Sequence, residues 1–194
     1  MFSDSFYWWV IAGVVILALL YFISLYNELV NLKNNVNKNW ANIDVLLKQR
    51  NDELPKLVDA CKVYMGFEKG TLEQMIQARN AGLKAQAEQN VAELNAAESI
   101  IHRGLGRIFA LAENYPDLKT NQSFLQLQSR ISELENQIAD RRELFNESVK
   151  INNVAIEQFP SNLVAGLFGF KPGSLLVFSE ARADLNVQDL FTKI

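Results

Sequence analysis

The uncharged apolar stretch at residues 6–26 most constrains what this chain can fold into. A helix over residues 7–26 would be about 30 Å long, which matches the hydrocarbon core of a bilayer. Amphipathic aromatic rings favour the two membrane interfaces. Aromatic residues cluster at both ends of the stretch: Tyr7, Trp8 and Trp9, then Tyr21, Phe22 and Tyr26. The stretch therefore predicts a membrane anchor that contacts the lipid bilayer.

Two other interpretations of this stretch are a cleaved signal peptide and a wholly buried core helix. No Lys or Arg precedes the apolar run and no small-x-small cleavage site follows it, which disfavours the signal peptide. A buried helix would leave the aromatic ends unexplained. Only Asp4 carries charge before the run, whereas Lys33 and Lys38 follow it, so we expect the N-terminus outside and the larger C-terminal part in the cytoplasm.

Composition limits the possible partners and chemistry. The chain has 194 residues, 19 Lys plus Arg, 22 Asp plus Glu, and a net charge of -3. It has no long basic block, so we expect no nucleic-acid partner. A single cysteine, Cys61, excludes an internal disulfide, and with the single His102 it leaves the usual Cys/His metal sites without enough ligands. We expect no cofactor, no metal site and no enzymatic activity, and we place His102 at the surface or at a helix end.

The remaining sequence reads as helices with one apolar stripe each. The first continues from the anchor, with a kink or a new start at Pro55 and a second possible break between Gly66 and Gly70; Pro116 and Pro160 end later helices. The predicted fold is all-α: a transmembrane helix that runs into an antiparallel up-and-down bundle. We expect three long helices, or four if the first breaks near Pro55 or Gly70. The expected parts are 1–26 (N-terminal tail and anchor), 27–158 (cytoplasmic bundle) and 159–194 (an irregular apolar tail).

The apolar tail is too short to span a membrane. It either caps the open end of the bundle, or contacts the membrane interface or a neighbouring subunit. The residues predicted to make this contact are Phe159, Leu163, Leu167, Phe168 and Phe170.

Several charged residues interrupt the apolar stripes: Arg50, Glu68, Arg79, Glu98 and Arg141. Long side chains at such positions can reach the edge of a bundle and stay solvated. Alternatively, helix reversals near residues 84 and 118 would bring Glu68, Glu98 and Arg141 to one level. The guanidinium of Arg141 could then bridge both carboxylates and fix the helix register.

Three segments resemble the LemA family of bacterial membrane proteins: residues 26–64, 115–128 and 159–172. With the anchor they cover most of the chain in the right order. The resemblance implies an N-terminal anchor, a cytoplasmic helical bundle and a poorly defined molecular function. It also implies a possible association with an HtpX-like membrane zinc protease. The chain departs from the family at residues 65–70, where the family more often has a continuous helix.

The sequence therefore favours a membrane-anchored, self-associating scaffold of the bacterial inner membrane without catalytic activity. Its expected partners are the lipid bilayer, further copies of the chain in a homo-oligomer, and another membrane protein. We also expect the long helices to pack as a coiled coil. The alternative function is an accessory or regulatory subunit of a membrane enzyme such as an HtpX-like protease.

Overall fold

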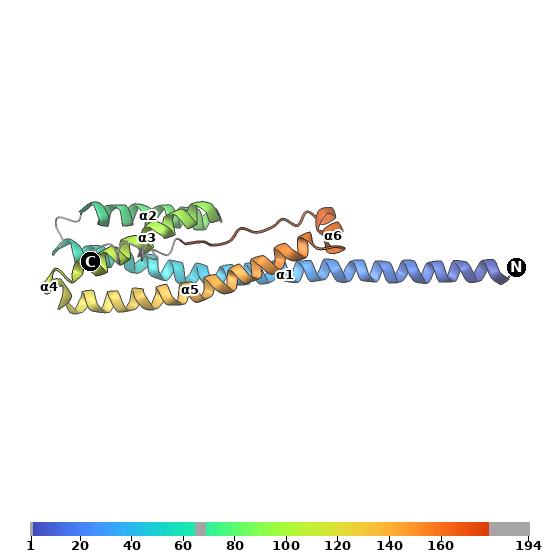
Figure 1. Cartoon of the computed structure of the whole chain (residues 1–194), viewed down its shortest axis with the longest axis horizontal. Helices are drawn as coiled ribbons and strands as arrows, with labels where there is room; N and C mark the ends of the chain where they lie inside the picture. Colours follow the sequence, from blue (N-terminus) through green and yellow to red (C-terminus); the bar gives the residue numbers. More distant parts are fainter. Residues whose placement is uncertain (1, 65–68, 179–194) are drawn as a thin grey trace, which may run out of the picture. The chain divides into compact units, whose positions relative to one another are not determined.

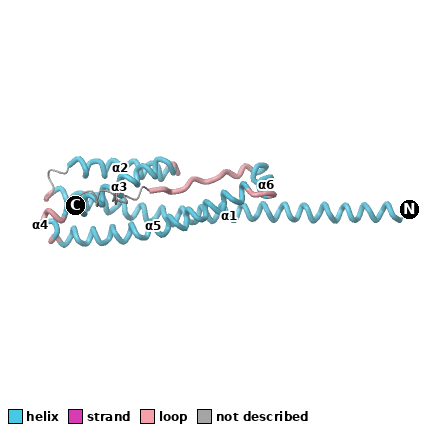
Figure 2. The backbone as a smooth tube through the Cα atoms, in the orientation of Figure 1, coloured by secondary structure: helices cyan, strands magenta, loops and turns pink. Residues whose placement is uncertain are grey.

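The computed structural model describes residues 2–64 and 69–178, with side chains from residue 6 onward. Helices account for most of this part of the chain, and it contains no strand (Figure 1, Figure 2). They are α1 (Phe2–Lys62), α2 (Lys69–Ala87), α3 (Val91–Ala112), α4 (Pro116–Lys119), α5 (Gln122–Glu157) and α6 (Ser161–Phe168). The predicted all-α fold class is confirmed.

The bundle has four long helices, because α1 ends at Lys62 and α2 begins at Lys69. Of the two predicted break points, Pro55 lies inside α1 without ending it, and the break falls near Gly70. The predicted tail is partly helical, since α6 precedes a non-helical stretch at residues 169–178. The rest of the tail, 179–194, lies outside the described residues.

A bond from another helix explains how α1 passes through Pro55. Proline has no backbone N–H, so the carbonyl four residues earlier, that of Asn51, loses its helical donor. The Nε of Arg79, on α2, donates to this carbonyl at 2.6 Å. Arg79, one of the charged stripe residues, therefore supplies the hydrogen bond that the proline removes.

The chain forms two compact units, each described here by itself. Unit 1 comprises Met1–Asn42 and Glu143–Leu175, and unit 2 comprises Ile43–Arg142 and Leu176–Ile194. The domain boundaries expected after residues 26 and 158 stay predictions.

Unit 2 contains the larger apolar core. The chain reverses direction at each connection between α1, α2, α3 and α5, as expected for an up-and-down bundle (Figure 1). Asn90 caps α3 by accepting from the N–H of Glu93 at 3.2 Å, and Asn121 caps α5 by accepting from the N–H of Phe124 at 3.0 Å. The fully buried core side chains include Leu54, Leu57, Cys61, Met75, Ile101, Ile108, Phe124 and Ile131.

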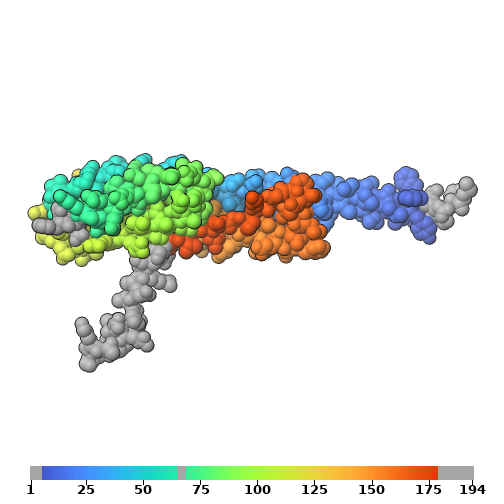
Figure 3. Space-filling view, turned by 90° about the horizontal axis from the view of Figure 1, so that it is seen from above, coloured from blue at the N-terminus to red at the C-terminus, as the bar shows by residue number. Residues whose placement is uncertain are grey.

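Unit 1 contains the first part of α1, the end of α5, helix α6 and the first residues of the non-helical stretch that follows it. The last part of α5 and helix α6, which are orange to red in Figure 3, lie against the part of α1 that is blue. The ring of Trp40 packs on that of Phe145, with centroids 5.6 Å apart. Beyond α6, the amide side chain of Asn153 holds Gly173 through two hydrogen bonds: its Nδ2 donates to the Gly173 carbonyl at 2.9 Å, and its Oδ1 accepts from the Gly173 N–H at 2.8 Å. The tail is therefore fastened to α5 within this unit.

We predict that Arg79→Met destabilises the protein by about 1–3 kcal/mol, because the Asn51 carbonyl is left without a donor. In a Pro55→Ala background the alanine N–H can bond this carbonyl, so the same change should cost about 1 kcal/mol less. Urea unfolding of the four proteins of this double-mutant cycle, in detergent, measures the coupling. Equal costs of Arg79→Met in both backgrounds would contradict the assignment.

Candidate functional site

The apolar part of α1 is almost uncovered by the rest of the described chain. Among the described residues, α1 is the helix long and apolar enough to cross a membrane, and only 6% of its apolar window is buried. The core helix of a soluble protein would instead be covered. The predicted anchor residues are all exposed: Tyr7, Trp8, Trp9, Tyr21, Phe22 and Tyr26. Such an apolar surface is costly in water and suits lipid, which is consistent with a membrane protein.

Helix α6 packs on α1 where this apolar part ends. Val164 and Ala165 of α6 are buried against Leu25 and Leu29 of α1. The ring centroid of Phe168 lies 4.7 Å from that of Tyr26, and that of Phe170 lies 6.0 Å from it. The contact therefore fixes α6 beside the aromatic residues at the end of the predicted span.

Other apolar side chains of α6 remain exposed, on its open side and at the edge of this contact. We call its exposed large side chains the α6 apolar surface: Phe159 (in the approach to the helix), Leu163, Leu167 and Phe168. Leu167 is 73% exposed, whereas Phe170, the fifth residue predicted for assembly or membrane contact, is half-buried. A short helix that is apolar on both its packed and its open side indicates a further contact.

A cluster of charged side chains lies inside unit 2. Arg50 of α1 and Glu98 of α3 are both 1% exposed, and the Arg50 Nη2 donates to the Glu98 Oε1 at 2.7 Å. The Arg50 Nη1 donates to Glu135 of α5 at 2.9 Å. His102, one turn after Glu98, lies 3.1 Å from the second oxygen of Glu135 through its Nδ1. Three helices thus share one network of ionic hydrogen bonds.

The network shifts the pKa of three of its members. Burial alone would lower the pKa of Arg50, but the carboxylates of Glu98 and Glu135 raise it above its usual value, so the guanidinium stays charged. The hydrogen bond to Glu135 raises the pKa of His102 despite its partial burial. Burial would raise the pKa of Glu135, but His102 and Arg50 together lower it. The network therefore favours the charged forms of Arg50, His102 and Glu135.

The predicted layer of Glu68, Glu98 and Arg141 is not what surrounds Glu98. Its cation is Arg50, while Arg141 is exposed, and Glu68 lies outside the described residues. The turn between α2 and α3 follows Ala87 instead of residue 84, and a Cβ on Gly82 of α2 would lie 3.8 Å from the Glu98 Oε1. On α5, Glu135 is at this level, and Arg141 lies six residues further, about 9 Å along the helix.

Sequence reasoning identified Arg50 and Glu98 as charges in apolar stripes, but it missed the roles of Glu135 and His102. Glu135 directly follows the buried Leu134, at the edge of the α5 stripe, and such flanking carboxylates are common on solvated faces. His102 was expected at the surface or a helix end; it lies inside α3 and is partly exposed. Its spacing of four residues from Glu98 was the one available signal, because it places both on one helical face.

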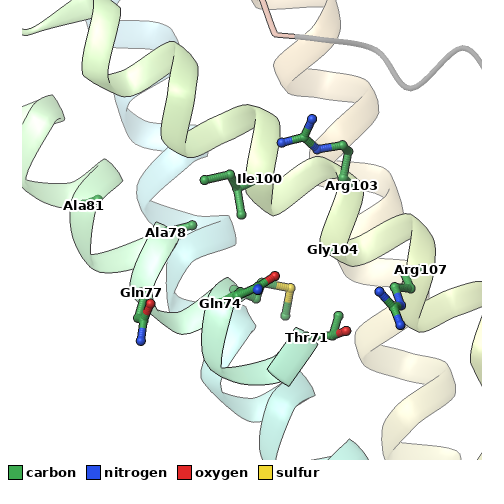
Figure 4. A pocket seen from close by; sticks show the side chains of 10 residues that line it. Thr71, Gln74, Gln77, Ala78, Ala81, Ile100, Arg103, Gly104 and Arg107 are labelled. Atoms are coloured by element: carbon green, nitrogen blue, oxygen red, sulfur yellow. The ribbon is translucent and has the colours of Figure 1, made fainter. Parts of the chain in front are cut away.

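A surface groove lies between α2 and α3 (Figure 4). Its volume is about 530 Å³, with Gln74 and Gln77 on the α2 side and Arg103 and Arg107 on the α3 side. No carboxylate, histidine or cysteine lines it. Its lining thus offers donors but no pair of groups for acid–base catalysis.

Elsewhere in the described part of the chain, no three His, Cys, Asp or Glu side chains gather as they would around a metal ion. The Cys61 thiol is buried, and burial raises its pKa to about 11, so it is protonated at neutral pH and is a poor nucleophile.

A helical bundle whose first helix extends into a long uncovered apolar segment defines a membrane-associated helical protein. The sequence pattern of the LemA family matches residues 39–188, and the chain belongs to that family.

Several characterised proteins are similar to this chain. Protein LemA of Metamycoplasma hominis is 28% identical over 166 residues, which cover 84% of this chain and 74% of that protein. Magnetosome protein MamQ 2 of Paramagnetospirillum magneticum and magnetosome protein MamQ of Magnetospirillum gryphiswaldense are each 22% identical. Both matches cover 75% of this chain, which spans 62% of the length of these magnetosome proteins.

We predict that Arg50→Met destabilises the protein by about 3–5 kcal/mol, because it leaves the buried Glu98 without a cation. The double change Arg50→Met with Glu98→Leu removes both charges and should recover most of this loss. Arg141→Met, at an exposed arginine, should change stability by less than about 0.5 kcal/mol. Denaturant unfolding of the detergent-solubilised chain compares them; a double variant as unstable as Arg50→Met alone would contradict the pairing.

Proposed function

We propose that this protein is a membrane-anchored scaffold that self-associates and organises other membrane components without catalysing a reaction. The observation that carries the proposal is an exposed stripe on α5 in unit 1, in a chain that also has an apolar anchor. We call it the α5 stripe: Leu144, Glu147, Ile151 and Val154 of α5, with Gln158 directly after its last residue. All five are exposed.

The spacing of the α5 stripe is that of a helix-packing seam. Its positions alternate by three and four residues, which keeps the four that are helical on one face over about three turns. Leu144, Ile151 and Val154 supply large apolar side chains, and the opposite face of α5 holds the buried Phe145 and Val149. A second copy of the chain fits this stripe, because an anchor confines all copies to one plane and raises their effective concentration. The polar positions Glu147 and Gln158 suit a reversible contact.

The names of the relatives support a structural role. Two of the relatives are named after the magnetosome and not after a reaction, which is in keeping with a scaffold. The alternative, an accessory subunit of a membrane enzyme such as an HtpX-like protease, requires a different protein on the same surfaces.

We further propose that the protein resides in the bacterial inner membrane, with the bundle in the cytoplasm and the N-terminus outside. Lys33 and Lys38 after the apolar segment support this orientation, since cationic flanks stay on the cytoplasmic side.

The α5 stripe is tested by Ile151→Lys with Val154→Lys. We expect the unchanged protein in mild detergent to run as a homo-oligomer. The dissociation constant of the double variant should be higher by a factor on the order of 100, because two apolar side chains that the contact would bury become charged. Light scattering after gel filtration gives the mass. Val45→Lys is the matched control, since Val45 is exposed on α1 in unit 2. Equal masses for all three proteins would refute the stripe, and a second protein in fixed ratio without self-association would favour the accessory role.

The orientation predicts the result of a protease experiment. Protease added to intact spheroplasts should leave residues 30–194 uncut, because the membrane shields a cytoplasmic bundle. Lysed spheroplasts are the control in which the same segment becomes accessible. Cleavage of this segment in intact spheroplasts would overturn the orientation.

A further inference from the structure

We propose that the α6 apolar surface (Phe159, Leu163, Leu167 and Phe168) inserts into the interface of the same bilayer that α1 crosses, as a second membrane contact. The proposal rests on the proposed membrane span of α1 but not on self-association through the α5 stripe. The sequence alone left the membrane and a neighbouring subunit as alternatives for this surface. The proposal selects the lipid bilayer.

The position of α6 along α1 provides the first argument. Val164 is 0% exposed and Ala165 2%, and both pack on Leu25 and Leu29. Leu25 and Leu29 flank Tyr26, at which the apolar segment of α1 ends. They lie four residues apart, or about 6 Å along the helix axis. If α1 spans the bilayer, these buried contacts hold α6 at the depth where hydrocarbon gives way to headgroups.

The chemistry of α6 matches that depth. Ser161 and Asn162 are its polar residues, at its first turn, and its other positions are apolar or small. The packed side uses Val164 and Ala165, so Leu163 and Leu167 remain on the open side. In water, these exposed side chains would form an apolar patch with no cover in the described chain. A short apolar helix parallel to a bilayer surface buries such side chains among the acyl chains.

Aromatic and cationic groups around α6 also fit an interface. Phe168 packs on Tyr26 at 4.7 Å, which makes one continuous aromatic surface from α1 to α6. The Nζ of Lys33 lies 6.0 Å from the ring centroid of Phe170, and Lys171 follows and is exposed. Lys33 follows the apolar segment of α1 in the sequence and Lys171 follows the apolar run of α6, as expected of cations that meet lipid phosphates. This continuity with the span favours lipid over a second protein as the occupant.

The test places a nitroxide label at single cysteines in the full chain, in phosphatidylcholine–phosphatidylglycerol nanodiscs. The background carries Cys61→Ser, and the test variants are Leu167→Cys and, as a second site, Leu163→Cys. Collision of the label with oxygen, which concentrates in lipid, is compared with collision with a water-soluble nickel chelate. Leu17→Cys reports on the apolar segment of α1, and Val45→Cys on an exposed apolar position of unit 2.

We expect the oxygen-to-nickel ratio at 167 and 163 to be several-fold above that at 45 and below that at 17, as an interfacial depth requires. A ratio at both α6 sites equal to that at 45 refutes the insertion of α6. Low accessibility to both reagents at the α6 sites also refutes it, because protein then covers the surface. If the ratio at 17 is low as well, α1 does not span the bilayer. This outcome separates failure of the proposed anchor from failure of the insertion of α6.

Discussion

The hydrogen bond from Arg79 to the carbonyl of Asn51 lets α1 remain one helix through Pro55. A proline in a helix interior removes a donor and leaves a buried carbonyl to be satisfied. Here a side chain from α2 satisfies it, so the break in the first helix is displaced toward Gly70. An unbroken α1 gives one element two roles: its first part carries the apolar segment, and its later part supplies Leu54, Leu57 and Arg50 to the core of unit 2.

The buried pair of Arg50 and Glu98 then restricts how the helices of unit 2 can align. Sliding α3 by a turn would separate the Arg50 guanidinium from the Glu98 carboxylate and leave Glu98 without a counter-charge in an apolar core. Apolar side chains tolerate such shifts better, because one leucine can replace another at a contact. The charged pair therefore adds more to the uniqueness of the register than to net stability, and Glu135 extends this restriction to α5.

Sequence reasoning predicted the positions of the helices better than the side-chain contacts between them. Apolar periodicity identified the stripes that become the core, and it identified Arg50, Arg79 and Glu98 as exceptions within them. It could not supply their partners, because a backbone carbonyl such as that of Asn51 has no sequence signature. A reversal placed at residue 84, a few residues before the observed turn, was enough to misassign the partner of Glu98. An error of a few residues in the predicted position of a turn therefore shifts the predicted contact partners by one or more helical turns.

Cys61 gives the chain a natural reporter of local opening. Its thiol is fully buried among Leu57, Val58 and their neighbours, and burial raises its pKa to about 11. An alkylating reagent needs both access and a thiolate, so its slow reaction would follow the transient exposure of this core and not a surface side chain. Since this is the single cysteine of the chain, the rate of modification in a living cell would measure how often this core opens while the protein remains in its own membrane.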